Sequence, residues 1–162
     1  MKMLRIAALA LVVAPFLPAV APAEDDQIEI SFSRASYSAV EGSAIVFKVV
    51  KEGSGDAVVS YETYENANSS SNNQATPGVD YETTQGELSF IGDETEKTFS
   101  VSTIDDSDAS TFGDVPAQTE ASEFFLVKLS LGSSSLQGGD TSAGNNVELV
   151  SPWRAAGVIL NK

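Results

Sequence analysis

The stretch SAIVFKVVK at residues 43–51 decides the fold class. In an extended chain, successive side chains point to opposite faces, so Ile45, Phe47 and Val49 share one face. The same alternation recurs at residues 56–64, 86–91, 95–104 and 123–131, where the intervening positions are mostly Ser, Thr, Glu and Lys. One apolar and one polar face is typical of an antiparallel sheet that packs on a core. The sequence therefore predicts an all-β protein.

Two further runs complete the set of predicted strands. Residues 27–40 form the first strand, which we expect to break near Arg34, and residues 155–160 form the last. The last run is apolar on both faces, so it needs cover on both sides. Polar connections are expected at residues 65–79, 105–122 and 132–146. Short strands at this spacing predict a two-sheet antiparallel β-sandwich.

The composition excludes several classes of chemistry. The chain has 162 residues, with 9 Lys plus Arg, 23 Asp plus Glu, no His, no Cys and a formal net charge of -14. Without His or Cys, the chain has no Ser-His-Asp or Cys-His nucleophile pair, no His or thiolate zinc site and no disulfide. Nucleic acid is not an expected partner, because affinity for phosphates comes largely from Lys and Arg. Any bound metal must be a hard ion held by oxygen.

The first 23 residues have the pattern of an export signal. Lys2 and Arg5 precede an apolar run at residues 6–20, and Ala-Pro-Ala follows at residues 21–23, as at a secretory cleavage site. A membrane anchor is the alternative, but the run is shorter than the roughly 20 residues of a spanning helix and contains prolines. We therefore expect a signal peptide at residues 1–23 and a single domain at residues 24–162. We also expect no transmembrane segment after cleavage and a secreted or periplasmic bacterial protein.

Acidic residues are expected to gather at one end of the sandwich. If consecutive strands run antiparallel, three strand connections and the end of the last strand lie at that end. The acidic residues there would be Glu41, Asp80, Glu82, Asp105, Asp106, Asp108, Asp114, Glu120 and Glu123. Clustered carboxylates repel unless a cation lies between them, and calcium accepts several oxygens in a forgiving geometry. Acidic loops also serve solubility, and the opposite end carries acids too, so these residues alone leave both interpretations open.

Several short motifs occur in an order that points to one family. They are VEG at residues 40–42, ATPGVDY at 75–81, GELSF at 86–90, IDD at 104–106 and EASEFF at 120–125. Over residues 33–160 the chain resembles a Calx-beta domain, the β-sandwich module of sodium-calcium exchangers, integrin cytoplasmic tails and many bacterial surface proteins. The most specific motifs are Gly-x-Asp-Tyr and the Asp-Asp pair followed by Glu-x-x-Glu. The resemblance implies an immunoglobulin-like sandwich.

The resemblance also implies a set of calcium ligands. They are Glu41, Asp80, Asp105, Asp106, Glu120 and Glu123. Calcium-binding members usually place a run of Asp after the last strand, where this chain has Asn161 and Lys162. The connection at residues 105–122 is also longer than usual. Both departures imply one weakly held ion, with a Kd of roughly 10⁻⁴ to 10⁻³ M, as in extracellular modules.

Two functions are compatible with this sequence. The first is a secreted calcium-binding module whose ion stabilises the domain or presents it to another surface or periplasmic protein. The alternative is a metal-free adhesion or structural interaction domain, in which the acids keep the protein soluble. An enzyme is not expected, because the chain has no recognisable nucleophile motif. We expect Tyr81 and Trp153 to pack rather than to bind a ligand.

Overall fold

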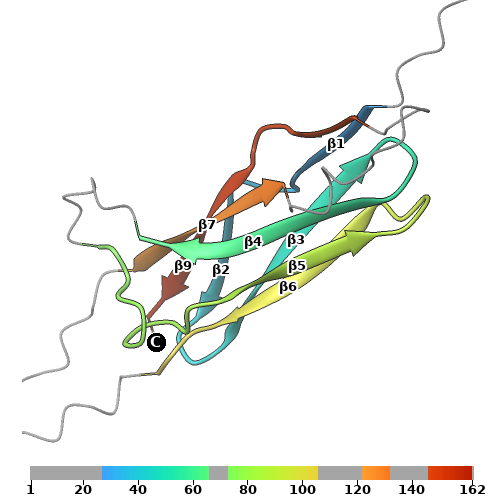
Figure 1. The fold of residues 1–162 in the computed structure, drawn as a ribbon. Coiled ribbons are helices and arrows are strands. Elements are labelled where there is room, and N and C mark those ends of the chain that lie inside the picture. The colour runs from blue at the N-terminus through green and yellow to red at the C-terminus, as the bar shows by residue number, and fades with distance from the viewer. Residues whose placement is uncertain (1–26, 66–72, 106–121, 132–145, 162) are drawn as a thin grey trace, which may run out of the picture.

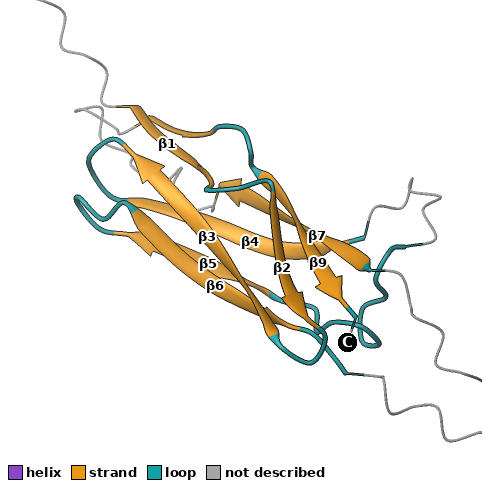
Figure 2. Ribbon diagram, turned by 180° about the vertical axis from the view of Figure 1, so that it is seen from behind, coloured by secondary structure: helices purple, strands orange, loops and turns teal. Residues whose placement is uncertain are grey.

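The computed structural model describes residues 27–65, 73–105, 122–131 and 146–161. The regular elements in these residues are β-strands that form the two facing sheets of a sandwich (Figure 1), and Figure 2 shows the same sandwich from behind. The strands are β1 (Gln27–Phe32), β2 (Ser36–Val40), β3 (Ala44–Glu52), β4 (Ala57–Tyr64), β5 (Gln85–Phe90), β6 (Glu96–Ser102), β7 (Glu123–Leu131), β8 (Asn146–Leu149) and β9 (Arg154–Leu160). One sheet has the order β6-β3-β1-β8 and the other β2-β9-β7-β4-β5. The predicted all-β sandwich is confirmed.

The first and last strands each divide between the two sheets. The expected break near Arg34 is present, because β1 lies in the four-stranded sheet and β2 in the five-stranded sheet. Later in the sequence, β8 and β9 divide between the two sheets in the same way, around residues 150–153. β1 pairs with β8, and β2 pairs with β9, both in parallel. The expectation of a wholly antiparallel sandwich is therefore wrong at these two pairs.

Strand β8 is an addition to the predicted set. It has four residues, of which Val147 and Leu149 are partly buried against the core. Two apolar positions are too few to establish an alternation in the sequence. Because β8 and β9 continue in one direction, the extra strand does not change the end at which β9 finishes (Figure 1).

The core lies between the two sheets. As the alternation predicted, Ile45, Phe47 and Val49 of β3 are at most 1% exposed. Across the core, Phe47 contacts Phe125 of β7, with ring centroids 6.1 Å apart. A Cβ built on Gly157 of β9 would lie 2.4 Å from Phe125 Cζ. This glycine is therefore required by the close approach of β9 to an aromatic ring.

Within the described ranges, we find no helix with the length and apolar character needed to span a bilayer.

Candidate functional site

Five segments meet at one end of the sandwich, which we call the acidic end. They are residues 41–43, 73–82, 103–105, 122–124 and 160–161. Backbone N–H groups donate to carbonyl oxygens from Glu41 to Leu160 (2.9 Å), Thr103 to Ser43 (3.1 Å), Ile104 to Asp80 (2.9 Å) and Phe124 to Asn73 (3.0 Å). In Figure 1 the β2–β3 turn and the end of β6 lie near the end of β9. The strand directions predicted that these strand connections would lie at the same end of the sandwich, and they do.

The turn between β2 and β3 brings two of the expected ligands to one corner. Glu41 is buried, with 8% of its surface exposed. Gly42 has a φ of 75°, a backbone conformation that favours glycine. A Cβ built on Gly42 would lie 3.0 Å from Asp105 Cβ and 3.3 Å from Asp105 Oδ2. The Asp105 carboxylate therefore lies against the turn that carries the buried Glu41.

Asp80 belongs to a turn that its own side chain stabilises. The Thr76 N–H donates to Asp80 Oδ2 at 2.6 Å, so one carboxylate oxygen closes the turn. The next residue, Tyr81, is 1% exposed and stacks on Phe125 with ring centroids 4.3 Å apart. The expectation that Tyr81 packs is confirmed. Its ring anchors the turn to the core and fixes Asp80 at the acidic end.

Burial and two nearby carboxylates act on the Tyr81 hydroxyl. Burial raises the pKa of Tyr81 above its usual value of 10.0, and the negative charges of Glu65 and Asp80 raise it further. Glu65 follows β4 directly and therefore contributes to the field of the acidic end. Glu65 begins the polar connection expected at residues 65–79 and is not among the expected ligands. The direction of the strand at residues 56–64 could have indicated its position, because that strand ends at this end.

Glu123 and Asn161 complete the described part of the acidic end. Glu123 opens β7, where it is half-buried and pairs with Ile159 of β9. Asn161 follows β9, and its Nδ2 atom is buried without a hydrogen-bond partner among the described residues. Rotation of the amide by 180° exchanges its nitrogen and oxygen, so Oδ1 can take this position and offer an oxygen ligand. This donor chemistry fits a hard cation.

The described ligands do not form a complete metal-coordination site. Asp106 and Glu120, two of the six expected ligands, lie outside the described residues. In the part of the chain that the structure describes, no three acidic side chains are grouped closely enough to hold a metal ion. The acidic end is thus a set of oxygen donors brought to one place, of which four expected ligands are described.

The order of these segments has a counterpart in known proteins. A family model for the Calx-beta domain matches residues 23–160. The chain belongs to the Calx-beta family. This family consists of non-catalytic β-sandwich domains that are associated with calcium in general. No curated protein matches the chain.

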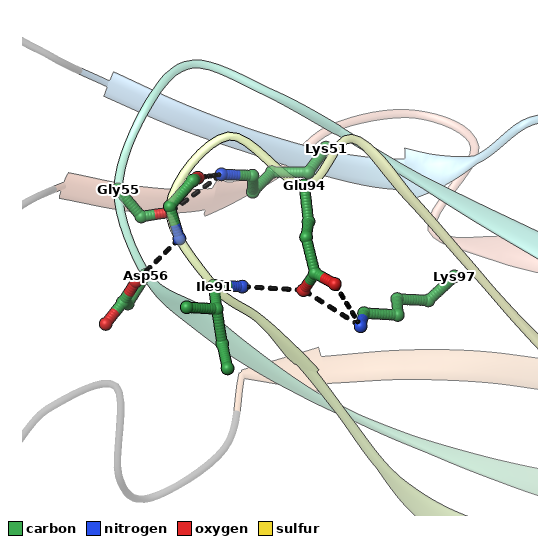
Figure 3. Close-up of polar contacts among 7 residues, drawn as sticks. Lys51, Gly55, Asp56, Ile91, Glu94 and Lys97 are labelled. Atoms are coloured by element: carbon green, nitrogen blue, oxygen red, sulfur yellow. Dashed lines mark hydrogen bonds and ion pairs between the residues drawn. The ribbon is translucent and has the colours of Figure 1, made fainter.

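The opposite end of this Calx-beta sandwich also carries acids, but a buried lysine organises it (Figure 3). Lys51 is 2% exposed. Its Nζ atom donates to the carbonyl oxygens of Gly55 at 2.7 Å and Gly92 at 2.6 Å. Asp56 Oδ1 accepts a hydrogen bond from the Gly92 N–H at 2.7 Å. One ammonium group therefore joins two loops that are distant in the Calx-beta sequence.

A second lysine accompanies Glu94 at that opposite end. Lys97 Nζ lies 2.8 Å from Glu94 Oε2, and the Ile91 N–H donates to the same oxygen at 2.9 Å. The hydrogen bond from Lys97, followed by that from Ile91, lowers the pKa of Glu94. The described residues of the five segments at the acidic end contain no Lys or Arg, and Lys162, the cation expected beside them, lies outside the described residues. At the opposite end of the Calx-beta domain, lysines therefore balance part of the negative charge.

Proposed function

We propose that the protein is an exported calcium-binding module in which one weakly held ion orders the acidic end. The observation that carries this proposal is that the segments holding Glu41, Asp80, Asp105 and Glu123 lie together at one end of the sandwich. Carboxylates gathered in this way repel one another, and a divalent cation relieves the repulsion. Calcium suits the site because it binds several oxygens in a forgiving geometry.

The proposed ligands come from both the described and the remaining residues. Glu41, Asp105 and Glu123 supply carboxylates, and Asp80 supplies the oxygen that is not bonded to Thr76. The set is completed by Asp106, Glu120 and the amide oxygen of Asn161. The described acids are not grouped in a cage, so binding must draw them together, which lowers affinity. We expect a Kd of roughly 10⁻⁴ to 10⁻³ M.

Calcium binding of this strength has a measurable effect on stability. An ion that binds only the folded state stabilises it by RT ln(1 + [L]/Kd), about 1 to 3 kcal/mol at roughly 10 mM calcium. For a domain of this size, the midpoint of thermal unfolding should rise by roughly 3 to 9 °C. The module would then become firmer on reaching a calcium-rich compartment.

Thermal unfolding in EDTA and in calcium tests the proposal. The expected result is a higher midpoint in calcium, a smaller effect of magnesium, and loss of the calcium effect in Asp105→Asn. Asp93→Asn is the matched control, because Asp93 is exposed at the opposite end, and it should keep the calcium effect. Equal midpoints in EDTA and calcium would refute calcium binding.

A metal-free adhesion or structural domain is the second candidate. It is favoured by the lack, among the described residues, of three acids grouped closely enough to hold a metal. In that case the acids only repel one another, and the double variant Asp105→Asn with Asp106→Asn should be as stable as the parent or more stable, in calcium as in EDTA. A clear loss of calcium-dependent stability in the double variant would exclude this candidate.

Export is a separate part of the proposal. Residues 1–23 would direct the chain out of the cytoplasm and be removed after Ala23. Mass spectrometry of the protein from the periplasm or medium should then give a chain that starts at Glu24. Recovery of the uncut chain from cells alone would contradict export.

A further inference from the structure

The outer face of the five-stranded sheet is partly apolar. The run at residues 155–160 was expected to need cover on both faces. Its inner residues, Ala155 and Ile159, are at most 3% exposed beneath the other sheet. Its outward residues Ala156 and Val158 are half-buried, and Leu160 is 39% exposed. The described sheets cover only the inner side, so the outer side of β9 is accessible to a partner.

Two rows of side chains cross this outer face. Strand register places Tyr64 of β4 beside Leu126 of β7 and Leu126 beside Ala156 of β9. The neighbouring row holds Glu62, Lys128 and Arg154 on the same strands. An open hollow of about 310 Å³ lies here, lined by Ala35, Tyr64, Leu126, Arg154, Ala155 and Ala156.

Arg154 is the distinctive group of this hollow. Its guanidinium carbon lies 3.9 Å from the centroid of the Trp153 ring and 6.0 Å from that of Tyr64. Trp153, which we expected to pack, is 36% exposed and supports the guanidinium at the surface. No carboxylate of the described residues forms an ion pair with Arg154, whereas Lys128 is paired with Glu62 at 2.7 Å. Aromatic rings therefore hold a planar cation whose N–H donors suit a carboxylate.

We propose that this hollow binds a peptide of a partner protein through a carboxylate that has an apolar side chain beside it. The carboxylate would accept hydrogen bonds from Arg154, and the apolar side chain would lie on Leu126 and Ala156. A sugar is a poorer match, because apart from Tyr64 and Arg154 the lining is alanine and leucine, whose side chains offer no partners for its hydroxyls. A polyanion is also disfavoured, since the chain carries a net charge of -14 and a single carboxylate meets less repulsion.

The protein carries its own reporter for this site. Trp153 is the one tryptophan in the sequence and lies against Arg154, so its fluorescence should change when a carboxylate engages the guanidinium. The probe is the peptide acetyl-Gly-Ser-Ala-Leu with a free terminal carboxylate, titrated into the full protein. A second peptide, acetyl-Gly-Leu-Glu-Leu-amide, carries its carboxylate on a side chain, so the comparison distinguishes a terminal from an internal source.

The expected result is saturable binding of at least one of the two peptides. If the terminal carboxylate binds Arg154, amidation of the first peptide should weaken its binding by about fivefold or more. The change Arg154→Gln should weaken by the same factor the binding of whichever peptide binds the parent protein. Lys48→Gln, a change on the other sheet where Lys48 pairs with Glu96, should leave binding unchanged. Circular dichroism checks that both variants are folded.

Three outcomes would overturn the proposal. They are the absence of a saturable change with either peptide, equal binding by the Arg154→Gln variant, and binding of sodium glucuronate as strong as that of the peptides. The titration is repeated in EDTA and in calcium. Because the hollow involves none of the proposed calcium ligands, the peptide Kd should be the same in both, so failure here is distinguishable from failure of the calcium proposal.

Discussion

Replacement of Lys51 by Met removes one charge from the interior while keeping most of the side-chain volume. Lys51 is 2% exposed, and its ammonium joins the carbonyls of Gly55 and Gly92. Hydrogen bonds from a charged donor contribute about 1.5 to 3 kcal/mol each. Removal of the buried charge regains part of its desolvation cost, and water can reach loop carbonyls. We therefore expect Lys51→Met to lower the free energy of unfolding by about 2 to 4 kcal/mol.

Urea denaturation and a thermal melt measure this effect. The midpoint of thermal unfolding should fall by roughly 6 to 12 °C. Lys97→Met is the control, because Lys97 forms a partly exposed ion pair with Glu94, and such pairs contribute at most about 1 kcal/mol. The loss in Lys51→Met should be the same in EDTA and in calcium, since Lys51 lies opposite the acidic end. A loss no larger than that of Lys97→Met would refute the reasoning that the ammonium joins the two loops.

Two further changes test the packing and the electrostatics of the fold. Gly157→Ala places a methyl group 2.4 Å from the Phe125 ring and should lower the free energy of unfolding by about 1 to 3 kcal/mol in urea denaturation; a variant as stable as the parent would contradict the close approach. Glu94→Gln tests a pH dependence. The hydrogen bond from Lys97 lowers the pKa of Glu94 in the folded state. The carboxylate therefore stabilises the fold above its unfolded pKa of about 4.3, and this contribution is lost as pH falls through the folded pKa. The stability difference between parent and variant should therefore be present at neutral pH and shrink on acidification, and a difference that grows below that range would count against it.

Most of the sandwich could be predicted because alternation reports directly on burial. The run with Ile45, Phe47 and Val49 has one apolar face in the sequence, and that face is in the core. The break near Arg34 was also predicted, but the parallel pairing of β1 with β8 was not. Strand β8 has only four residues, and its pairing depends on a strand more than 100 residues earlier in the chain.

The location of the acidic end could be predicted, whereas the orientation of its side chains could not. Strand direction alone brings Glu41, Asp80 and Asp105 to one end. The use of one Asp80 oxygen by the Thr76 N–H depends on the geometry of a turn, which residue types only partly specify. The ligand assignments of Asp106 and Glu120 remain predictions, since both lie outside the described residues.

The contacts of buried polar groups were the hardest feature to predict from the sequence. Lys51 is the next position on the face of Ile45, Phe47 and Val49, so alternation places it on the core side, but lysine is a residue type that is almost never fully buried. Its burial depends on carbonyl groups from two separate loops, at Gly55 and Gly92. A sequence pattern read along one strand does not contain such contacts.

The two parallel strand pairs have a mechanical consequence. In one sheet, the early strand β1 pairs with the late strand β8, and in the other sheet β2 pairs with β9. Tension between the beginning of β1 and the end of β9 acts along these strands and therefore across the hydrogen bonds between them. For the paired strands to slide apart, all the hydrogen bonds of a pair must break together. Pulling would therefore load both ladders at once, instead of breaking the hydrogen bonds one after another.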